Sequence, residues 1–178
     1  PGSVVGNHLI NDPRVDMVSF TGGLNTGQTI MKAAVSTVKR LALELGGKNP
    51  HIIFADSDID AAIDNAVTAA FLHSGQVCSA GTRLIVERSI HDRVVKEIVR
   101  RAGQIRLGGP EDLSAETGPL ISKSHLEGVT KYVEKGIAEG ATLLVGGKRS
   151  ESSEHANGWY YLPTVLDNCN TKMFCVQD

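Results

Sequence analysis

Short apolar segments alternate with longer amphipathic segments along the chain, and glycine or proline separates most of them. The apolar segments have the length of strands, whereas the amphipathic segments repeat with the period of a helix. The predicted strands are Val15–Phe20, Arg40–Leu45, His51–Phe54, Arg83–Glu87, Ala141–Val145 and Tyr160–Val165, and the predicted helices are Gln28–Val38, Asp58–Leu72, Ile90–Ile105 and Ser122–Glu139. This alternation is typical of an α/β fold.

The organisation changes near Gly46–Pro50. The strand, the turn at Thr21–Gly27 and the helix before it resemble the later part of a nucleotide-binding fold, and a new run of strands and helices follows. A doubly wound sheet needs several such units, so we expect residues 1–46 to be an incomplete domain and residues 47–178 to start another. The chain has no starting Met, and Met173–Asp178 predict neither a capped helix nor a polar tail, so we expect truncation at both ends.

Charge and apolar content argue against several classes of protein. With 178 residues and a net charge of −2, the chain has no electrostatic footprint for nucleic acid or for an anionic membrane. It has no run of roughly 18 apolar residues that could span a membrane, and Pro1–Asn11 lacks the pattern of a signal peptide. Three cysteines without paired metal-ligand spacing predict a reducing compartment, the cytoplasm, and no metal site.

Cys78 lies in the small-residue loop Gly75–Gly81, directly after a predicted helix. Glycines let a backbone pass close to a ligand, and a cysteine thiolate is a strong nucleophile near neutral pH. A lone cysteine is more often a buried structural residue, so the loop alone leaves both roles open. Cys169 and Cys175 have no flanking glycines, and for them we predict a structural role.

Glu44 is a carboxylate within the otherwise apolar end of the segment Arg40–Leu45. Burying an unpaired charge is costly, and a desolvated carboxylate is a plausible general base. A salt bridge to Lys48, or an exposed position on an edge strand, explains the residue equally well.

A glycine-rich turn, Gly22–Gly27, separates the first predicted strand from the first predicted helix. Backbone amides at such a position can contact a cofactor. The turn does not have the GxGxxG spacing of a dinucleotide-binding fingerprint, so on its own it is explained better as a plain tight turn.

Taken together, the order and spacing of these motifs resemble the aldehyde dehydrogenase superfamily. The glutamate and cysteine motifs of that family match around Glu44 and Cys78, and the separation of 34 residues (78 − 44) is similar to the usual one. The motifs that carry the resemblance are Phe20–Gly23, Leu43–Pro50, Gly75–Cys78, Thr117–Ile121 and Leu162–Val165, which extend it over essentially the whole chain. Two of them, Ser19–Gly23 and Gly75–Gly81, are similar to those of bacterial betaine aldehyde dehydrogenases.

The resemblance implies that residues 1–46 are the end of a Rossmann-type NAD(P)-binding domain and that residues 47–178 are most of an α/β catalytic domain. It implies NAD as cofactor, with NADP as the alternative, and a homodimer or homotetramer. The implied reaction is oxidation of an aldehyde, betaine aldehyde in particular, to a carboxylic acid. Cys78 would form a thiohemiacetal and then a thioester, and Glu44 would activate the water that hydrolyses the thioester. The implied cofactor contacts are Gly22, Gly23, Leu24, Asn25, Thr26, Gly27, Leu45 and Gly46.

Some parts of the family's site lie outside this sequence, and other functions remain open. The oxyanion asparagine and the ribose-binding lysine and glutamate of the family are absent, so we expect the isolated chain to be inactive. A cysteine hydrolase or acyltransferase would need a histidine beside Cys78, and His73 is the nearest in sequence. A non-catalytic relative would not need to keep Glu44 and Cys78. Relatives that transfer the acyl group to CoA commonly lack the glutamate, so Glu44 favours hydrolysis.

Overall fold

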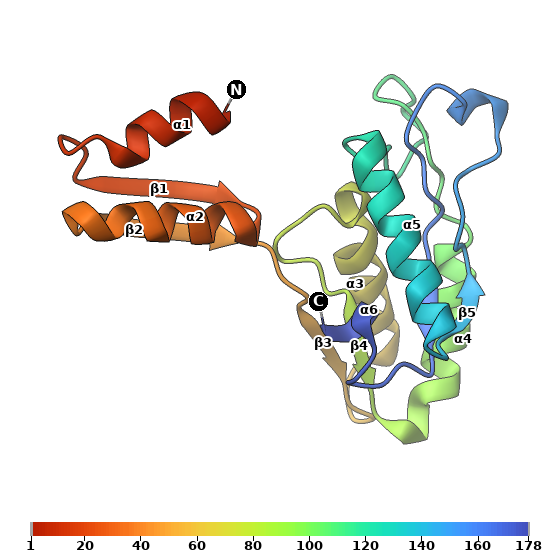
Figure 1. The fold of residues 1–178 in the computed structure, drawn as a ribbon. Coiled ribbons are helices and arrows are strands. Elements are labelled where there is room, and N and C mark those ends of the chain that lie inside the picture. The colour runs from red at the N-terminus through yellow and green to blue at the C-terminus, as the bar shows by residue number, and fades with distance from the viewer. Residues whose placement is uncertain (1, 178) are drawn as a thin grey trace. The chain divides into compact units, whose positions relative to one another are not determined.

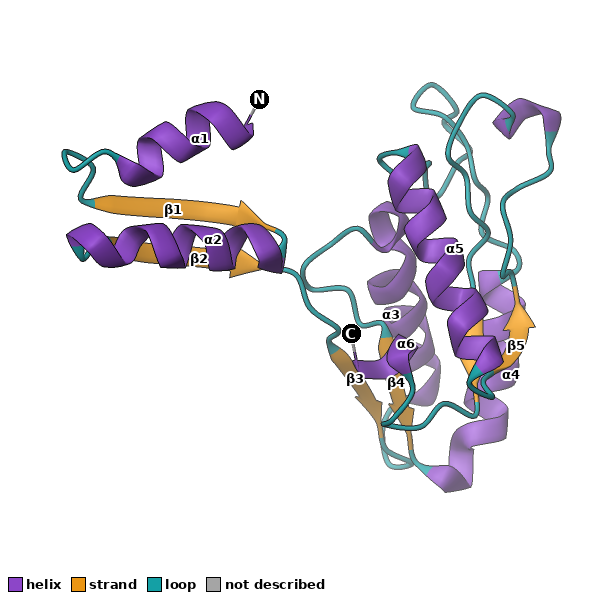
Figure 2. Cartoon of the chain, viewed as in Figure 1, coloured by secondary structure: helices purple, strands orange, loops and turns teal. Residues whose placement is uncertain are grey.

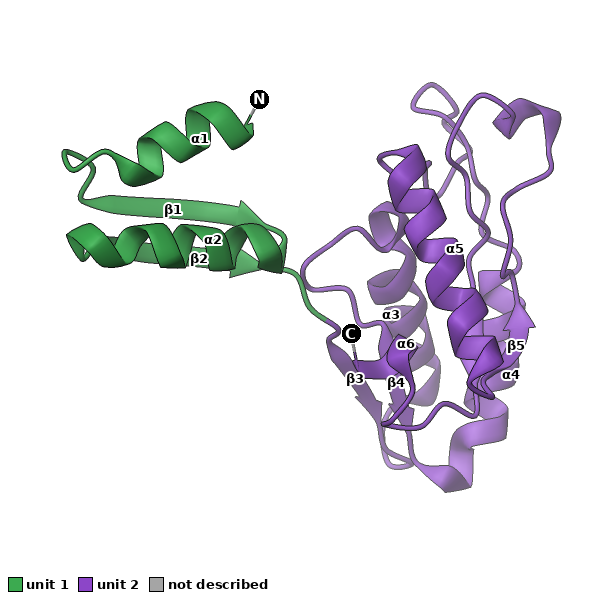
Figure 3. Cartoon of the chain, viewed as in Figure 1, with its two compact units in different colours: residues 1–47 green, residues 48–178 purple. Residues whose placement is uncertain are grey.

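The computed structural model describes residues 2–177 and divides the chain into two compact units, Pro1–Gly47 and Lys48–Asp178 (Figure 3). The elements of the first unit are α1 (Gly2–Asn11), β1 (Met17–Gly22), α2 (Leu24–Ala34), the 3₁₀ turn η1 (Val35–Thr37) and β2 (Arg40–Leu45) (Figure 1). β1 and β2 pair in parallel, with Met17 opposite Arg40 and Gly22 opposite Leu45. The connection between parallel strands therefore passes through a helix, α2, as such a crossover requires.

Lys39 is the buried charged residue that closes the first unit. Its ammonium group donates to the carbonyl oxygens of Asp12 and Val15 at 2.6 and 2.7 Å. A buried ammonium is tolerated only when its donors are satisfied, and here two backbone acceptors satisfy it. These bonds tie the start of β2 to the turn between α1 and β1.

Two predictions for the first unit need correction. The predicted turn Thr21–Gly27 is much shorter, because β1 extends to Gly22 and α2 already begins at Leu24. The helix predicted at Gln28–Val38 begins and ends earlier in the structure. α2 runs from Leu24 to Ala34, and Val38 is left-handed with φ 51°. Valine, serine and threonine beyond Ala34 are weak helix formers, which favours this earlier end. The helix α1 was not predicted. Among its apolar residues only Ile10 is buried.

The second unit begins with a parallel β–α–β arrangement (Figure 2). Its first elements are β3 (Pro50–Ile53), α3 (Ile59–Phe71), η2 (Leu72–Gly75), β4 (Arg83–Val86), η3 (Arg88–Ile90) and α4 (His91–Ala102). β3 pairs with β4 in register, from Pro50 opposite Arg83 to Ile53 opposite Val86. Asp58 caps α3 by accepting from the backbone N–H of Ala61, as the Asp-rich start of the predicted helix indicated.

The core of the second unit lies where α3 and α4 meet the strands. Ile53, Ile63 and Val94 are at most 1% exposed, and Ile59, Ala66 and Ile98 complete the buried cluster. The buried residues of α3 and α4 recur every three or four positions, so each helix presents one apolar stripe to the core. This packing fixes the two ends of the segment that joins α3 to β4.

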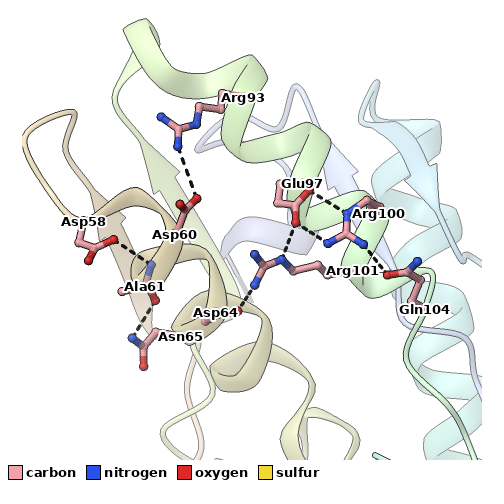
Figure 4. Close-up of polar contacts among 10 residues, drawn as sticks. All are labelled: Asp58, Asp60, Ala61, Asp64, Asn65, Arg93, Glu97, Arg100, Arg101 and Gln104. Carbon is pink, nitrogen blue, oxygen red and sulfur yellow. Dashed lines mark hydrogen bonds and ion pairs between the residues drawn. The ribbon is translucent and has the colours of Figure 1, made fainter.

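Ion pairs add a polar link between the outer faces of α3 and α4 (Figure 4). Arg93 reaches Asp60 at 3.4 Å, and Arg101 pairs with Asp64. Within α4, the Glu97 carboxylate accepts hydrogen bonds from both Arg100 and Arg101. Arg93, Asp60 and Asp64 are mostly solvent-exposed, so the pairs between the helices contribute little to stability, and the apolar stripe remains the main contact between α3 and α4.

The rest of the second unit is α5 (Lys123–Ala138), β5 (Thr142–Val145), η4 (Ser153–His155), β6 (Val165–Asp167) and α6 (Phe174–Gln177). β5 and β6 are antiparallel, with an irregularity between Leu143 and Val145. The predicted strand Tyr160–Val165 is wrong except at its last residue: Tyr161 makes only an isolated bridge to Arg149. Pro163 has no N–H for a ladder, which explains the late start of β6. The short helix α6 lies at the end of the described chain and was not predicted.

One face of the β3–β4 sheet is not covered by the other described elements of the second unit. Ile52 and Ile85, which are opposite each other in the register, are 55% and 51% exposed, and Phe54 is 62% exposed. Parallel sheets are normally covered on both faces, so these side chains form an apolar face without a layer from this part of the chain.

We predict that Ile63→Ala lowers the free energy of unfolding of the full-length protein by about 3 kcal/mol, because it leaves a cavity in the core of the second unit. Urea unfolding followed by circular dichroism measures the change. Leu113→Ala is the control, since Leu113 is 100% exposed. Equal shifts for the two variants would contradict this location of the core.

Candidate functional site

The loop that carries Cys78 begins with three successive left-handed residues. His73, Ser74 and Gly75 have φ of 50°, 60° and 72°. This conformation is natural for glycine but costs a non-glycine residue on the order of 1 kcal/mol or more. Because the preceding helix α3 ends at Phe71, the three residues turn the chain sharply away from the helix axis. Such strain persists only where surrounding contacts hold it.

Ser74 supplies those contacts by bonding to the segment Thr117–Gly118. Its backbone N–H donates to the Thr117 hydroxyl at 2.8 Å, and its own hydroxyl donates to the Gly118 carbonyl at 2.6 Å. The Thr117 hydroxyl also lies 3.2 Å from the carbonyl of Phe71, where α3 ends. All of these groups are partly buried, so the bonds compete little with water.

Gln76 makes a second connection to the same segment. Its side-chain carbonyl accepts from the backbone N–H of Ile121 at 2.9 Å, and its amide donates to the carbonyl of His73 at 3.2 Å. The Thr117–Ile121 motif thus supports the cysteine loop directly. In the sequence this motif contributes only to the resemblance, and no local signal predicts its structural role.

Cys78 itself is exposed in a tight turn. The backbone N–H of Ala80 donates to the carbonyl of Val77 at 3.0 Å, which makes Cys78 and Ser79 the central residues of the turn. The side-chain amide of Asn49 donates to the Cys78 carbonyl at 2.6 Å. Among the described residues, no histidine is hydrogen-bonded to the Cys78 thiol, and His73 instead offers its backbone carbonyl to Gln76.

The other two cysteines differ chemically from Cys78. Burial of the Cys169 sulfur, reinforced by the neighbouring Cys175, raises the pKa of the Cys169 thiol to about 11, although part of the residue reaches solvent. A thiol with that pKa is protonated at neutral pH and is a poor nucleophile. Cys175 is half-buried against Gly136, where an added Cβ would lie 3.0 Å from its sulfur. The structural role of both cysteines stays a prediction.

Glu44 lies near the end of β2, opposite Thr21, and is exposed. β2 is an edge strand of the two-stranded sheet in residues 2–47. The expectation of a buried carboxylate is therefore wrong for this structure, and the alternative of an exposed edge position is the one observed. The strand alternates its side chains, so the residues on either side of Glu44 are half-buried while its carboxylate points outward. Glu44 belongs to the first unit and Cys78 to the second.

The predicted cofactor-binding glycines divide into two kinds. Gly23 is exposed, has extended backbone angles and precedes α2, where no side chain caps the first turn. The following residues, Leu24, Asn25 and Thr26, are also exposed. A helix start with no acidic residue and no side-chain cap suits an anionic group such as a pyrophosphate.

Gly27, by contrast, is buried against the side chain of Leu45, to which an added Cβ would come within 2.9 Å. Its lack of a side chain lets α2 approach β2, so its observed contact is one of packing. Gly22 is half-buried beside the ring of Phe20. Leu45 is half-buried and Gly46 is exposed, which leaves the backbone at the end of β2 open on the surface of the first unit.

No three His, Cys, Asp or Glu side chains of residues 2–177 are grouped so that they could hold a metal ion. None of the helices in this range is long and apolar enough to cross a membrane.

Comparison with known proteins identifies the family. The family model described as "Aldehyde dehydrogenase family" matches residues 1–178. The chain belongs to the aldehyde dehydrogenase family. Its similarity to a betaine aldehyde dehydrogenase of Bacillus subtilis (strain 168) is 53% identity over 178 residues, which is 100% of this chain and 36% of that protein. The chain thus spans about a third of the length of this relative.

Solved structures of family members share the fold. A betaine aldehyde dehydrogenase from Staphylococcus aureus in complex with NAD⁺ matches with a TM-score of 0.97 and 46% identity, covering 100% of this chain and 35% of that one. A double mutant of the same enzyme, also in complex with NAD⁺, matches with a TM-score of 0.97 over 100% of this chain and 36% of that one. The predicted α/β fold of the aldehyde dehydrogenase type is confirmed.

We predict that iodoacetamide alkylates Cys78 well before Cys169 at about pH 8, because a thiol with a pKa of about 11 is then thiolate in only about one molecule in a thousand. Alkylation of Cys169 should accelerate roughly tenfold per pH unit up to its pKa. Timed labelling of the full-length protein with peptide mass spectrometry measures both rates. A Cys169 rate that is independent of pH would contradict the assignment.

Proposed function

We propose that this chain is the part of an NAD-dependent aldehyde dehydrogenase that carries the nucleophile and the general base, and that the full-length enzyme oxidises betaine aldehyde to glycine betaine. The observation that carries the proposal is the family match over residues 1–178, with Glu44 and Cys78 both present in the matching motifs. The relative from Bacillus subtilis and the solved structures from Staphylococcus aureus support this aldehyde and this cofactor. NADP is the alternative cofactor.

In this proposal Cys78 attacks the aldehyde carbon. Its thiolate forms a carbon–sulfur bond, and the carbonyl electron pair moves to oxygen, which gives a thiohemiacetal alkoxide. An aldehyde has no leaving group, so this addition creates the tetrahedral carbon from which hydride can depart. The developing oxyanion needs hydrogen-bond donors, and the backbone N–H of Cys78 is the one that this chain supplies. The exposure of Cys78 in its turn leaves room for the substrate.

Bound NAD would supply the hydride acceptor, and loss of hydride from that carbon would leave a thioester on Cys78. The residues proposed to hold the cofactor are Gly22 to Gly27, Leu45 and Gly46. The uncapped start of α2 at Gly23 offers its backbone donors to the pyrophosphate. Gly27 contributes by letting α2 pack closely on β2, and Leu45 and Gly46 contribute backbone at the nicotinamide side.

Glu44 acts as the base for the second half of the reaction. Its carboxylate takes a proton from water, whose oxygen attacks the thioester carbon, and the carbon–sulfur bond breaks to release the acid and free Cys78. The support for this role is the place of Glu44 in the motif that matches the family's glutamate, near the end of β2. In the proposal, Glu44 and Cys78 act on the same thioester in the full-length enzyme.

A cysteine hydrolase or acyltransferase without a redox cofactor is the competing function. It would need a histidine to activate Cys78, and none is hydrogen-bonded to the thiol within residues 2–177. Mixing the full-length protein with betaine aldehyde and NAD separates the two. The dehydrogenase produces NADH, which absorbs at about 340 nm. No NADH with betaine aldehyde or with other aldehydes would overturn the proposal.

We also propose a cytoplasmic homodimer or homotetramer for the full-length enzyme. The sparse cysteines fit a reducing compartment. The oligomer rests on the resemblance to the family, and sedimentation of the full-length protein tests it.

We predict that Cys78→Ala in the full-length protein lowers the rate of aldehyde oxidation roughly 10⁴-fold or more, because no other described cysteine is placed to form the covalent adduct. The NADH assay measures the loss. Cys169→Ala is the matched control and should keep its activity, since the thiol of Cys169 is protonated at neutral pH. Equal losses in the two variants would contradict the role of Cys78.

We predict that Glu44→Gln slows steady-state turnover roughly 100-fold while the first turnover of NADH keeps its normal amplitude, because the amide cannot accept a proton from water. Stopped-flow absorbance resolves the burst from the steady state. Glu111→Gln, at an exposed loop position, is the control. A burst reduced as much as the steady state would show that Glu44 acts before hydride transfer.

A further inference from the structure

Asn49 makes the contacts that join the cysteine loop to the strand β3. Its side-chain amide donates to the carbonyl of Cys78 at 2.6 Å and to the carbonyl of Ala80 at 3.2 Å. Both donors of one amide group are therefore used on either side of Ser79. Ala80 is only 3% exposed, so its carbonyl lies where a lost hydrogen bond is not fully replaced by water.

The backbone of Asn49 is itself held in place. Its carbonyl accepts from the backbone N–H of Arg83 at 3.2 Å, one residue before the β3–β4 ladder begins. The side chain is half-buried, which restricts its rotamers. The amide of Asn49 is thus a donor fixed to the sheet, and it reaches a loop 29 positions further along the chain.

The peptide groups on both sides of Cys78 are consequently oriented. A peptide is planar and trans, so fixing its carbonyl also fixes the direction of its N–H. The Val77 carbonyl accepts from Ala80, which aims the Cys78 N–H in the opposite direction. The Cys78 carbonyl accepts from Asn49, which fixes the rotation about the bond that follows the Cα of Cys78. Together they determine where the Cα–Cβ bond, and with it the sulfur, can point.

We propose that Asn49 is a positioning residue that acts through Cys78: its amide holds the nucleophile's backbone so that the sulfur and the Cys78 N–H face the same carbonyl group of the substrate. The inference rests on the proposed function, because it takes Cys78 as the nucleophile. A nucleophile displaced by about 1 Å can lose on the order of 100-fold in rate, so a single amide that fixes the turn has a large effect on the first chemical step.

The test uses Asn49→Ala in the full-length protein, with Asn65→Ala as matched control. Asn65 also donates its side-chain amide to a backbone carbonyl, that of Ala61 at 2.9 Å, but it lies on the exposed face of α3 (Figure 4). We expect Asn49→Ala to lower the rate constant of the NADH burst about tenfold or more, with the KM for NAD within about twofold of the unmodified protein. The control should leave both quantities unchanged, and the two variants should melt within a few degrees of each other.

A burst rate of Asn49→Ala within about twofold of the control would overturn the proposal, as would an equal loss in burst rate and NAD affinity. If Asn49→Ala does not fold, Asn49→Leu has a similar size, no charge and no donor, and the same two outcomes decide. If the unmodified protein yields no NADH with any aldehyde, the proposed function fails. Alkylation of Cys78 by iodoacetamide then decides on Asn49: a rate unchanged in Asn49→Ala overturns the positioning role, and a rate changed several-fold supports it.

Discussion

The packing of α3 against the β3–β4 sheet is the constraint on which the cysteine loop depends. Ile53 and Ile63 are almost completely buried in that contact, so the end of α3 and the start of β4 have fixed positions. Between these ends the chain reverses through three left-handed residues and a tight turn. That conformation is unfavourable in isolation, and the bonds from Asn49, Ser74 and Gln76 stabilise it. The apolar core of the second unit thus determines the position of the exposed Cys78 thiol.

Much of the fold was predictable because its signals are local. Asp58 indicated the start of α3, and the apolar stripes of α3 and α4 indicated their extent. Predictions failed where long-range contacts decide. The short turn at Gly23 follows from the burial of Gly27 against Leu45. The exposure of Glu44 depends on which residues cover β2, and no local pattern reports that.

The candidate site was only partly predictable for a related reason. Cys78 is recognisable in the sequence because small residues surround a reactive side chain. Glu44 is recognisable because its charge interrupts an apolar run. Asn49 has neither signal. Its importance comes from two carbonyl oxygens that the fold brings to its amide, and the sequence shows it only as one letter of a longer motif. Residues that act through the backbone of another residue are invisible until the backbone path is known.

The exposed apolar face formed by Ile52, Phe54 and Ile85 affects the solubility of this part of the protein. Within the second unit, these branched and aromatic side chains are exposed to water. Exposed apolar surfaces promote association between chains, and chaperones bind such surfaces during synthesis. A protein limited to this region is therefore expected to aggregate as its concentration rises. Mild detergent or a fused solubility partner would counteract the aggregation.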